Sequence, residues 1–313
     1  MSSSLVATVP GDSRRQFLAG LEALRLSLDS QLVSGSDAVG SFLRRGLTIV
    51  SYNLLESFIS TRLDEIANYI NSGLTHFIDL PDKLQRAATV DVMRFANSRM
   101  QRSRWDPASA LPFMTSIGES LAASSGPLKL SPLTWQWSGS NMIADDLHRA
   151  MRLFHVASPW QTIEMFSNRT GHSMPDPKTT VESLLRERNL CAHESSYQVS
   201  NLWIRAVPYQ LQVIGMGVDI AISVSAQEMH LANSDFFQDI NWMSSNRIQF
   251  RYVQQRSRTW AEMMEGKTRA FRVGNDKDSI LREAINRARG KHQIVVVQNE
   301  VLQPIDWIYP EVP

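Results

Sequence analysis

The sequence predicts a mainly α protein, a helical bundle with an inserted irregular segment, followed by a small α+β domain at the C-terminus. Apolar residues recur at helical spacing through most of residues 13–229. Prolines interrupt this pattern between residues 105 and 139, which predicts the insertion. Beyond residue 235 the apolar period shortens to two, as in strands. We therefore expect a helical domain over 1–234 and a small α+β domain over 235–313.

Length, cysteine content and hydropathy place the chain among soluble globular proteins. Its 313 residues suffice for one large or two ordinary domains. The single cysteine, Cys191, excludes an intramolecular disulfide, and residues 1–10 lack a basic start followed by an apolar run. The most apolar stretch, 211–224, carries Asp219 and is shorter than the roughly 20 residues that cross a bilayer. We expect a cytoplasmic protein without a membrane segment.

The net charge of +1 gives the chain no overall attraction to nucleic acid. Any contact with RNA must therefore come from a local group of basic side chains.

Helical spacing predicts a series of helices in the first domain. Gly40 and Gly46 are weak points of the second helix, and Pro208 predicts a kink in the last one. The expected helices cover residues 13–32, 37–71, 81–100, 113–123, 143–154, 160–166, 180–193 and 200–229.

The helix expected from Thr180 carries the most informative side chains. Thr179 and Glu182 have the spacing of a capping box. On a helical wheel Arg188 lies near the centre of an apolar stripe, where a permanent charge is costly unless it is paired or faces a wet cleft. The other members of this stripe are Val181, Leu184, Leu185 and Ala192.

Arg188 and His193 are about 140° apart around an ideal helix. They meet at one ligand only if the arginine reaches round, the helix deforms, or two helices share the site, and we favour a shared site. A purely structural alternative is that Arg188 forms a buried ion pair, for example with Glu56, and that His193 is a satisfied interhelical histidine.

The segment from Arg188 to Glu194, Arg-Asn-Leu-Cys-Ala-His-Glu, resembles the Arg-x4-His signature of the HEPN superfamily. The earlier segment 44–58 contains Leu-Glu-Ser-Phe and resembles the first long helix of the RiboL-PSP type of HEPN domain. The resemblance implies a HEPN-like bundle in which Glu56 faces the motif helix. The alternative reading of Glu56 is a solvated carboxylate that supports its own helix.

The resemblance to HEPN ribonucleases also implies an activity. RNA carries its own nucleophile, the 2'-hydroxyl, so cleavage to a 2',3'-cyclic phosphate needs only proton transfer and stabilisation of the phosphorane. Histidine transfers protons near neutral pH and arginine binds phosphate oxygens, which are the implied roles of His193 and Arg188. Asn189 would orient the imidazole or the phosphate, with Glu194 and Ser195 as supporting residues at the rim.

Because one imidazole cannot be acid and base at once, the resemblance implies a homodimer with both motif helices in one cleft. Many such proteins are toxins or antiphage (abortive infection) effectors, so an antitoxin or another defence-system partner is expected. In some HEPN toxins a modified tyrosine lies two residues after the histidine, but here that position is Ser195. The alternative function is a noncatalytic HEPN dimerisation or RNA-binding module, or a subunit of a larger defence complex.

The C-terminal domain is expected to contain strands near 248–253, 269–273 and 294–297, and a helix from Asp278 that stops at Gly290. Basic residues alternate with aromatic ones there, a pattern that suits phosphates and stacked bases. An ordinary half-exposed sheet with a basic face is the alternative. The arginines proposed to contact RNA are Arg247, Arg251, Arg269 and Arg272.

Metal-ligating patterns are weak in this sequence. No two of His148, His155 and His172 form His-x3-His, and His193-Glu194 lacks the second histidine of a zincin. We expect neither a metal nor another cofactor.

Overall fold

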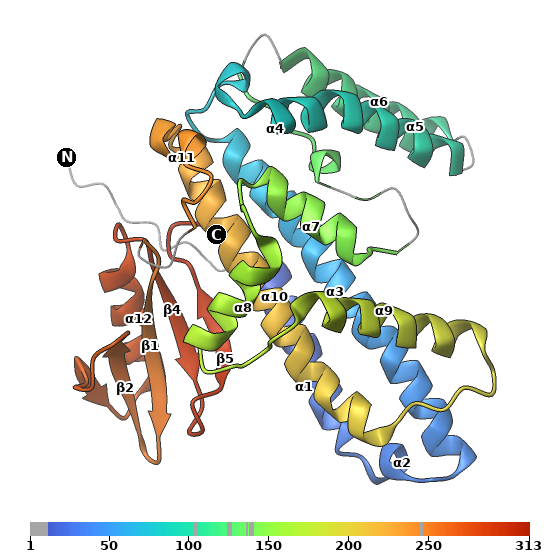
Figure 1. Cartoon of the computed structure of the whole chain (residues 1–313), viewed down its shortest axis with the longest axis vertical. Helices are drawn as coiled ribbons and strands as arrows, with labels where there is room; N and C mark the ends of the chain where they lie inside the picture. The colour runs from blue at the N-terminus through green and yellow to red at the C-terminus, as the bar shows by residue number, and fades with distance from the viewer. Residues whose placement is uncertain (1–11, 103–105, 124–126, 136, 138–140, 244–246) are drawn as a thin grey trace.

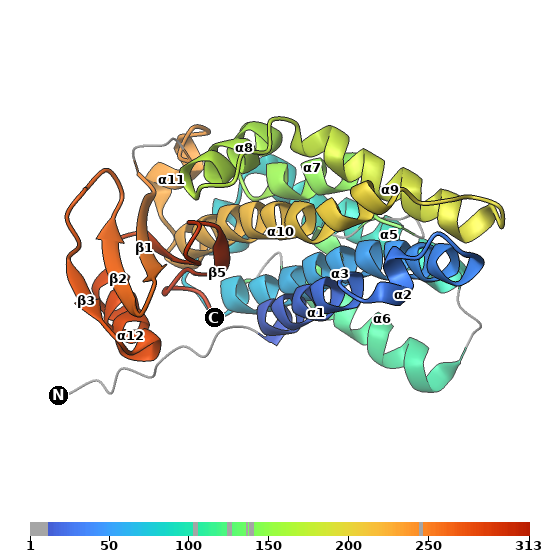
Figure 2. The same cartoon turned by 90° about the horizontal axis from the view of Figure 1, so that it is seen from below.

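The computed structural model describes residues 12–102, 106–123, 127–135, 137, 141–243 and 247–313. Two long helices, α3 (Ala38–Asn71) and α10 (Asn201–His230), pack along each other at the centre (Figures 1 and 2). Around them lie α1 (Asp12–Leu28), α8 (Pro159–Arg169) and α9 (Pro177–His193). The predicted mainly helical architecture is confirmed.

Helix α3 begins where the sequence predicts, because the Asp37 carboxylate accepts a 2.7 Å hydrogen bond from the Gly40 amide. It continues through both of its glycines to Asn71. A Cβ at Gly40 would lie only 2.3 Å from the Gly35 carbonyl oxygen, so glycine there lets the short helix α2 (Gln31–Ser34) approach α3.

Helix α10 is long and apolar enough to span a membrane, but 89% of the relevant window is buried inside the protein. It is the core helix of the bundle, in agreement with the expectation of a buried helix over 211–224.

The segment expected to be an irregular insertion is more helical than predicted. Helix α6 (Pro107–Ala122) starts at a proline, and Asp106 caps it by accepting from the Ala108 and Ser109 amides. Proline is favourable at the first helical position, so Pro107 begins the helix instead of breaking it. Together with α5 (Val92–Arg102), α6 projects from one end of the bundle (Figure 1). The remaining short elements are α4 (Asp82–Arg86), a π-helical turn (Ala87–Asp91), α7 (Ala144–Leu153), α11 (Ser234–Gln238) and 3-10 turns at Phe77–Asp79 and Pro132–Thr134.

The C-terminal region forms a mixed five-stranded sheet with strand order β3-β2-β1-β4-β5. Strands β1 and β4 are parallel, and the other neighbours are antiparallel. Helix α12 (Lys277–Ala288) connects β3 to β4. The strands are β1 (Gln249–Arg256), β2 (Thr259–Met264), β3 (Arg272–Gly274), β4 (Gln293–Gln298) and β5 (Pro304–Ile308).

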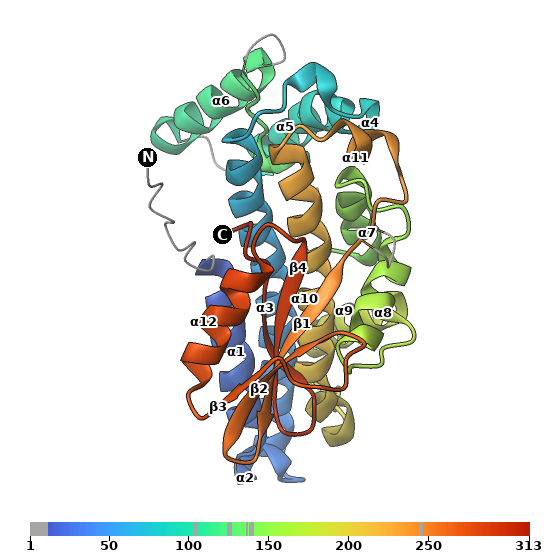
Figure 3. The same cartoon turned by 90° about the vertical axis from the view of Figure 1, so that its left-hand side faces the viewer.

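Both faces of this sheet are covered (Figures 2 and 3). One face packs on α12 through a cluster that contains Val253, Val295 and Val297. The other face joins the main core of the bundle, where the rings of Phe166 on α8 and Phe250 on β1 are 5.8 Å apart. The sheet is therefore the middle layer between α12 and the helical bundle.

Candidate functional site

The motif helix α9 begins earlier than the sequence suggests. Asp176 is its N-cap, and the carboxylate accepts a 2.9 Å hydrogen bond from the Thr179 amide. Pro177 occupies the first helical position, where its missing N–H has no cost. The predicted capping box of Thr179 and Glu182 is therefore wrong, because the helix already begins at Pro177 and the Asp176 side chain caps it.

The buried face of α9 is rotated relative to the predicted stripe. Glu187, not Arg188, lies among the buried residues, while Arg188 is half-buried on the flank and Ala192 is exposed. Glu187 is accommodated because its carboxylate accepts a hydrogen bond from the Tyr197 hydroxyl and lies 3.3 Å from the Arg186 guanidinium. The hydrogen bond to Glu187 raises the pKa of Tyr197 to about 12. The apolar members of this face are Val181, Leu184 and Cys191.

Arg45 on α3 fixes the C-terminal end of α9. Its guanidinium donates to the Cys191 carbonyl (2.8 Å) and to the Ser195 carbonyl (2.7 Å). The Cys191 oxygen is one of the last helix carbonyls, which lack intrahelical partners, and the Ser195 oxygen follows the end of the helix. The backbone around His193 and Ser195 is thus held against α3, while both side chains remain exposed.

The Arg188 guanidinium has few protein partners. Its Nη1 donates to the Asn189 side-chain oxygen at 3.2 Å, and its buried Nε has no hydrogen-bond partner among the described residues. Within that same set, no carboxylate lies within 4 Å of it. The alternative of a direct ion pair between Arg188 and Glu56 is therefore not what the structure contains.

Glu56 is near enough to Arg188 for the two charges to interact, but its carboxylate accepts its hydrogen bond from the chain before α7. Burial raises the pKa of its carboxyl group, against the lowering effects of the Met142 amide, which donates at 2.5 Å, and of Arg188. The hydroxyl of Tyr52, one turn earlier on α3, donates to the Met142 carbonyl. Glu56 and Tyr52 thereby fasten the chain just before α7 to α3.

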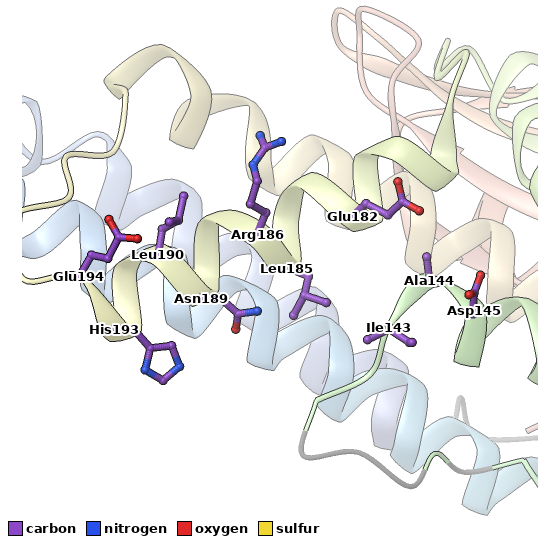
Figure 4. Close-up of a pocket in the computed structure, with 10 residues that line it drawn as sticks. All are labelled: Ile143, Ala144, Asp145, Glu182, Leu185, Arg186, Asn189, Leu190, His193 and Glu194. Atoms are coloured by element: carbon purple, nitrogen blue, oxygen red, sulfur yellow. The ribbon is translucent and has the colours of Figure 1, made fainter.

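A surface groove of about 540 Å³ runs between the outer face of α9 and the start of α7 (Figure 4). Asn189 and His193 point to the same side of α9, and Glu194 lies beside them at the helix end. Arg188, Glu56 and Ser195 do not line it. The structure thus places Asn189, His193 and Glu194 together and leaves Arg188 on a different flank of the helix.

Two polar groove residues, Arg186 and Asp145, were not singled out from the sequence. Glu182, Arg186, Asn189 and His193 follow one another at positions i, i+4, i+7 and i+11, a helix-face pattern that the sequence already contains. Asp145 could not be found in this way, because it joins the groove from α7 through tertiary packing. The apolar lining residues are Ile143, Ala144, Leu185 and Leu190.

The arginines of the C-terminal sheet are only partly available to a ligand. Arg251 is 4% exposed and is held by Glu262 and by Gln293, so the expectation that it contacts RNA at the surface is wrong. The reason is that α12 covers this face of the sheet. Arg272 is exposed and pairs with Glu283 on α12.

Two further arginines of this proposed surface remain accessible. Arg247 is exposed, lies 3.3 Å from Asp239 and stacks 3.8 Å from the centre of the Trp242 ring. Arg269 is also exposed. These positions do not form one continuous basic face with Arg251.

In the described part of the chain, no three His, Cys, Asp or Glu side chains are grouped so that they could hold a metal ion. Comparisons with protein-family models, curated proteins and solved structures find no match for this chain.

Proposed function

We propose that this protein is a metal-independent endoribonuclease of the HEPN type, which cleaves RNA by attack of the 2'-hydroxyl and leaves a 2',3'-cyclic phosphate. Arg188, Asn189 and His193 are the proposed catalytic residues. RNA supplies the nucleophile, so the protein has to contribute proton transfer and positive charge.

The observation that carries this proposal is the state of Arg188. Arg188 is half-buried, and its charge acts on Glu56 only at a distance, because among the described residues no carboxylate lies within 4 Å of it. Its buried Nε makes no hydrogen bond to those residues. Desolvating part of a permanent charge without pairing it is unfavourable for folding alone. A phosphate would supply the missing acceptors in the bidentate geometry that arginine favours.

His193, in contrast to Arg188, is accessible to a ligand from solvent. It is exposed in the last turn of α9 and lines the groove, where an RNA strand can reach it. Histidine can accept or donate a proton near neutral pH. Asn189 links the two residues, because it accepts from Arg188 and also lines the groove.

We further propose that two copies of α9 form the complete site. Arg188 and His193 leave the helix on different sides, so one copy presents them poorly to a single phosphate. A homodimer through the motif helices would also supply separate acid and base imidazoles. A cytoplasmic toxin or antiphage effector, with an antitoxin or defence partner, is the proposed biological setting.

The first experiment is RNA cleavage by the purified protein in excess EDTA. We expect cleavage with cyclic phosphate ends, and a loss of about 10²- to 10⁴-fold in rate for His193→Ala, because proton transfer contributes that much. Arg188→Ala should lose activity as well. His76→Ala is the matched control, an exposed histidine outside the groove.

Each outcome discriminates between functions. Cleavage that disappears in EDTA, or that is unchanged in folded His193→Ala, would contradict the proposed mechanism. RNA binding that persists in both variants without any cleavage would instead support a noncatalytic HEPN dimerisation or RNA-binding module, or a subunit of a larger complex.

A further inference from the structure

We propose that the groove between α9 and α7 is a nucleobase subsite, which selects bases with an exocyclic amino group (adenine, cytosine or guanine) over uracil. This inference rests on the proposed ribonuclease function and adds a substrate preference to it.

The middle of the groove suits the flat faces of a base. Its volume of about 540 Å³ lies within the range of small-molecule sites. Leu185 from α9 and Ile143 from the chain before α7 supply apolar surface, and Ile143 is 46% exposed. A base that packs against these side chains would remove apolar surface from water. Unpaired bases in single-stranded RNA are commonly bound in this way.

The polar side chains of the groove are separated along its length (Figure 4). Glu182 and Asp145 lie at one end, one on each wall, and Arg186 follows Glu182 along α9. His193 lies at the other end, beside Glu194. Carboxylates repel phosphate but accept hydrogen bonds from amino groups. In nucleobases such groups are carried by adenine, cytosine and guanine, whereas uracil has none. Two carboxylates on opposite walls therefore make this end, which we call the acidic end, favour a base edge over a backbone phosphate.

Neither Glu182 nor Asp145 makes a strong structural contact with the described residues. Asp146, not Asp145, accepts the hydrogen bond from the Ile143 amide at the start of α7 (3.0 Å). Glu182 lies 3.5 Å from Lys178, but both side chains are about half exposed, and such a pair contributes little to stability. Both acids can therefore reorient toward a ligand.

The order of residues along α9 sets the orientation of the bound nucleotide. Glu182 and His193 are separated by about 16 Å along the helix axis, and Asn189 lies about 6 Å from His193. A nucleotide with its sugar and phosphate near His193 would direct its base past Asn189 toward the acidic end. The Asn189 amide can hydrogen bond to the base as both donor and acceptor.

The test uses oligouridine RNA that carries a single adenosine, cytidine or guanosine. We expect wild-type protein to cut next to the inserted base roughly tenfold faster than within the uridines, the discrimination typical of a good polar contact to a base. Combined Glu182→Ala and Asp145→Ala removes both acceptors and should abolish this preference while cleavage continues. Glu300→Ala, at an exposed carboxylate after β4, is the matched control and should keep the preference.

A second measurement separates this inference from the proposed nuclease activity. Oligonucleotides of 2'-deoxyuridine with one deoxyadenosine, deoxycytidine or deoxyguanosine lack the nucleophile, so their binding does not depend on cleavage. Tighter binding of the amino-bearing oligonucleotides by wild type, lost in the double variant, supports the subsite even if no RNA is cut. Equal binding of all four, or an unchanged preference in the double variant, overturns it.

Discussion

At the scale of single residues, His172 is expected to make folding sensitive to acid. It is 1% exposed, and its ring lies 4.4 Å from that of Tyr209. Burial, with a smaller contribution from the charge of Arg25, lowers the pKa of His172 from 6.5 to about 4. Between these pH values the unfolded chain binds more protons than the folded one, so the free energy of unfolding falls as the pH falls. The slope from this residue approaches about 1.4 kcal/mol per pH unit.

This prediction is tested by urea unfolding of wild type and His172→Phe at several pH values between 4 and 7. Phenylalanine keeps a ring at this position and cannot titrate, so the variant should lose less stability than wild type over that range. An identical pH dependence of the two proteins would show that His172 is not the cause.

Residue types at the site were predictable from the sequence, but their partners were not. The motif positions Asn189 and His193 were identified, and both line a groove. The placement of Arg188 at the centre of the buried face was wrong, because Glu187 takes that place with Tyr197 as its donor. Tyr197 lies after the helix ends, so a helical wheel contains no information about this pairing.

At the scale of elements, the position of the end of α9 depends on Arg45. Replacing it by methionine removes two charged donors from the Cys191 and Ser195 carbonyls. We expect Arg45→Met to lower the free energy of unfolding by about 1–2 kcal/mol, since hydrogen bonds to charged groups are stronger than neutral ones. Amide hydrogen exchange in the last turn of α9 should accelerate, and RNA cleavage should fall although Arg45 does not line the groove.

The control for this prediction is Arg15→Met on α1. Arg15 is exposed and pairs with Asp12, also exposed, so the change should cost less than about 0.5 kcal/mol. Equal effects of the two substitutions would mean that Arg45 does not hold the helix end.

Most helices were predictable as elements, whereas two of the five strands were not. The helices have long periodic patterns, and several have an aspartate as N-cap, in two cases followed directly by proline. Strands β2 and β5 show no clear alternation, because both faces of the sheet are covered and Glu262 on β2 is completely buried. The Glu262 charge is tolerated because it pairs with Arg251 and Arg287. These three residues meet only in the folded protein, so the pattern of β2 in the sequence does not reveal them.

At the scale of the whole molecule, a buried polar cluster joins the sheet to the bundle. Asp219 on α10 is 3% exposed and accepts hydrogen bonds from Arg62 on α3 (2.6 Å), Ser223 (2.9 Å) and the Trp307 indole on β5 (2.7 Å). The Trp307 ring also packs 6.4 Å from the ring of Phe58. Residues from both predicted domains, 1–234 and 235–313, thus share one polar cluster and one hydrophobic core.

This arrangement predicts that the sheet and the helices unfold together. Asp219→Ala leaves the Arg62 charge buried without its main partner, which typically costs about 3–5 kcal/mol, whereas Trp307→Phe removes one neutral donor and should cost about 1–2 kcal/mol. Amide hydrogen exchange in urea should show peptides from β1, β4 and α10 becoming unprotected at the same urea concentration, and at a lower one in Asp219→Ala. The contrary result would be exchange of the sheet peptides while α10 stays protected. Because loss of the sheet from a shared core would expose the apolar surface of the helices, that result would mean that the sheet and the bundle are independently stable and that the cluster is only a local contact.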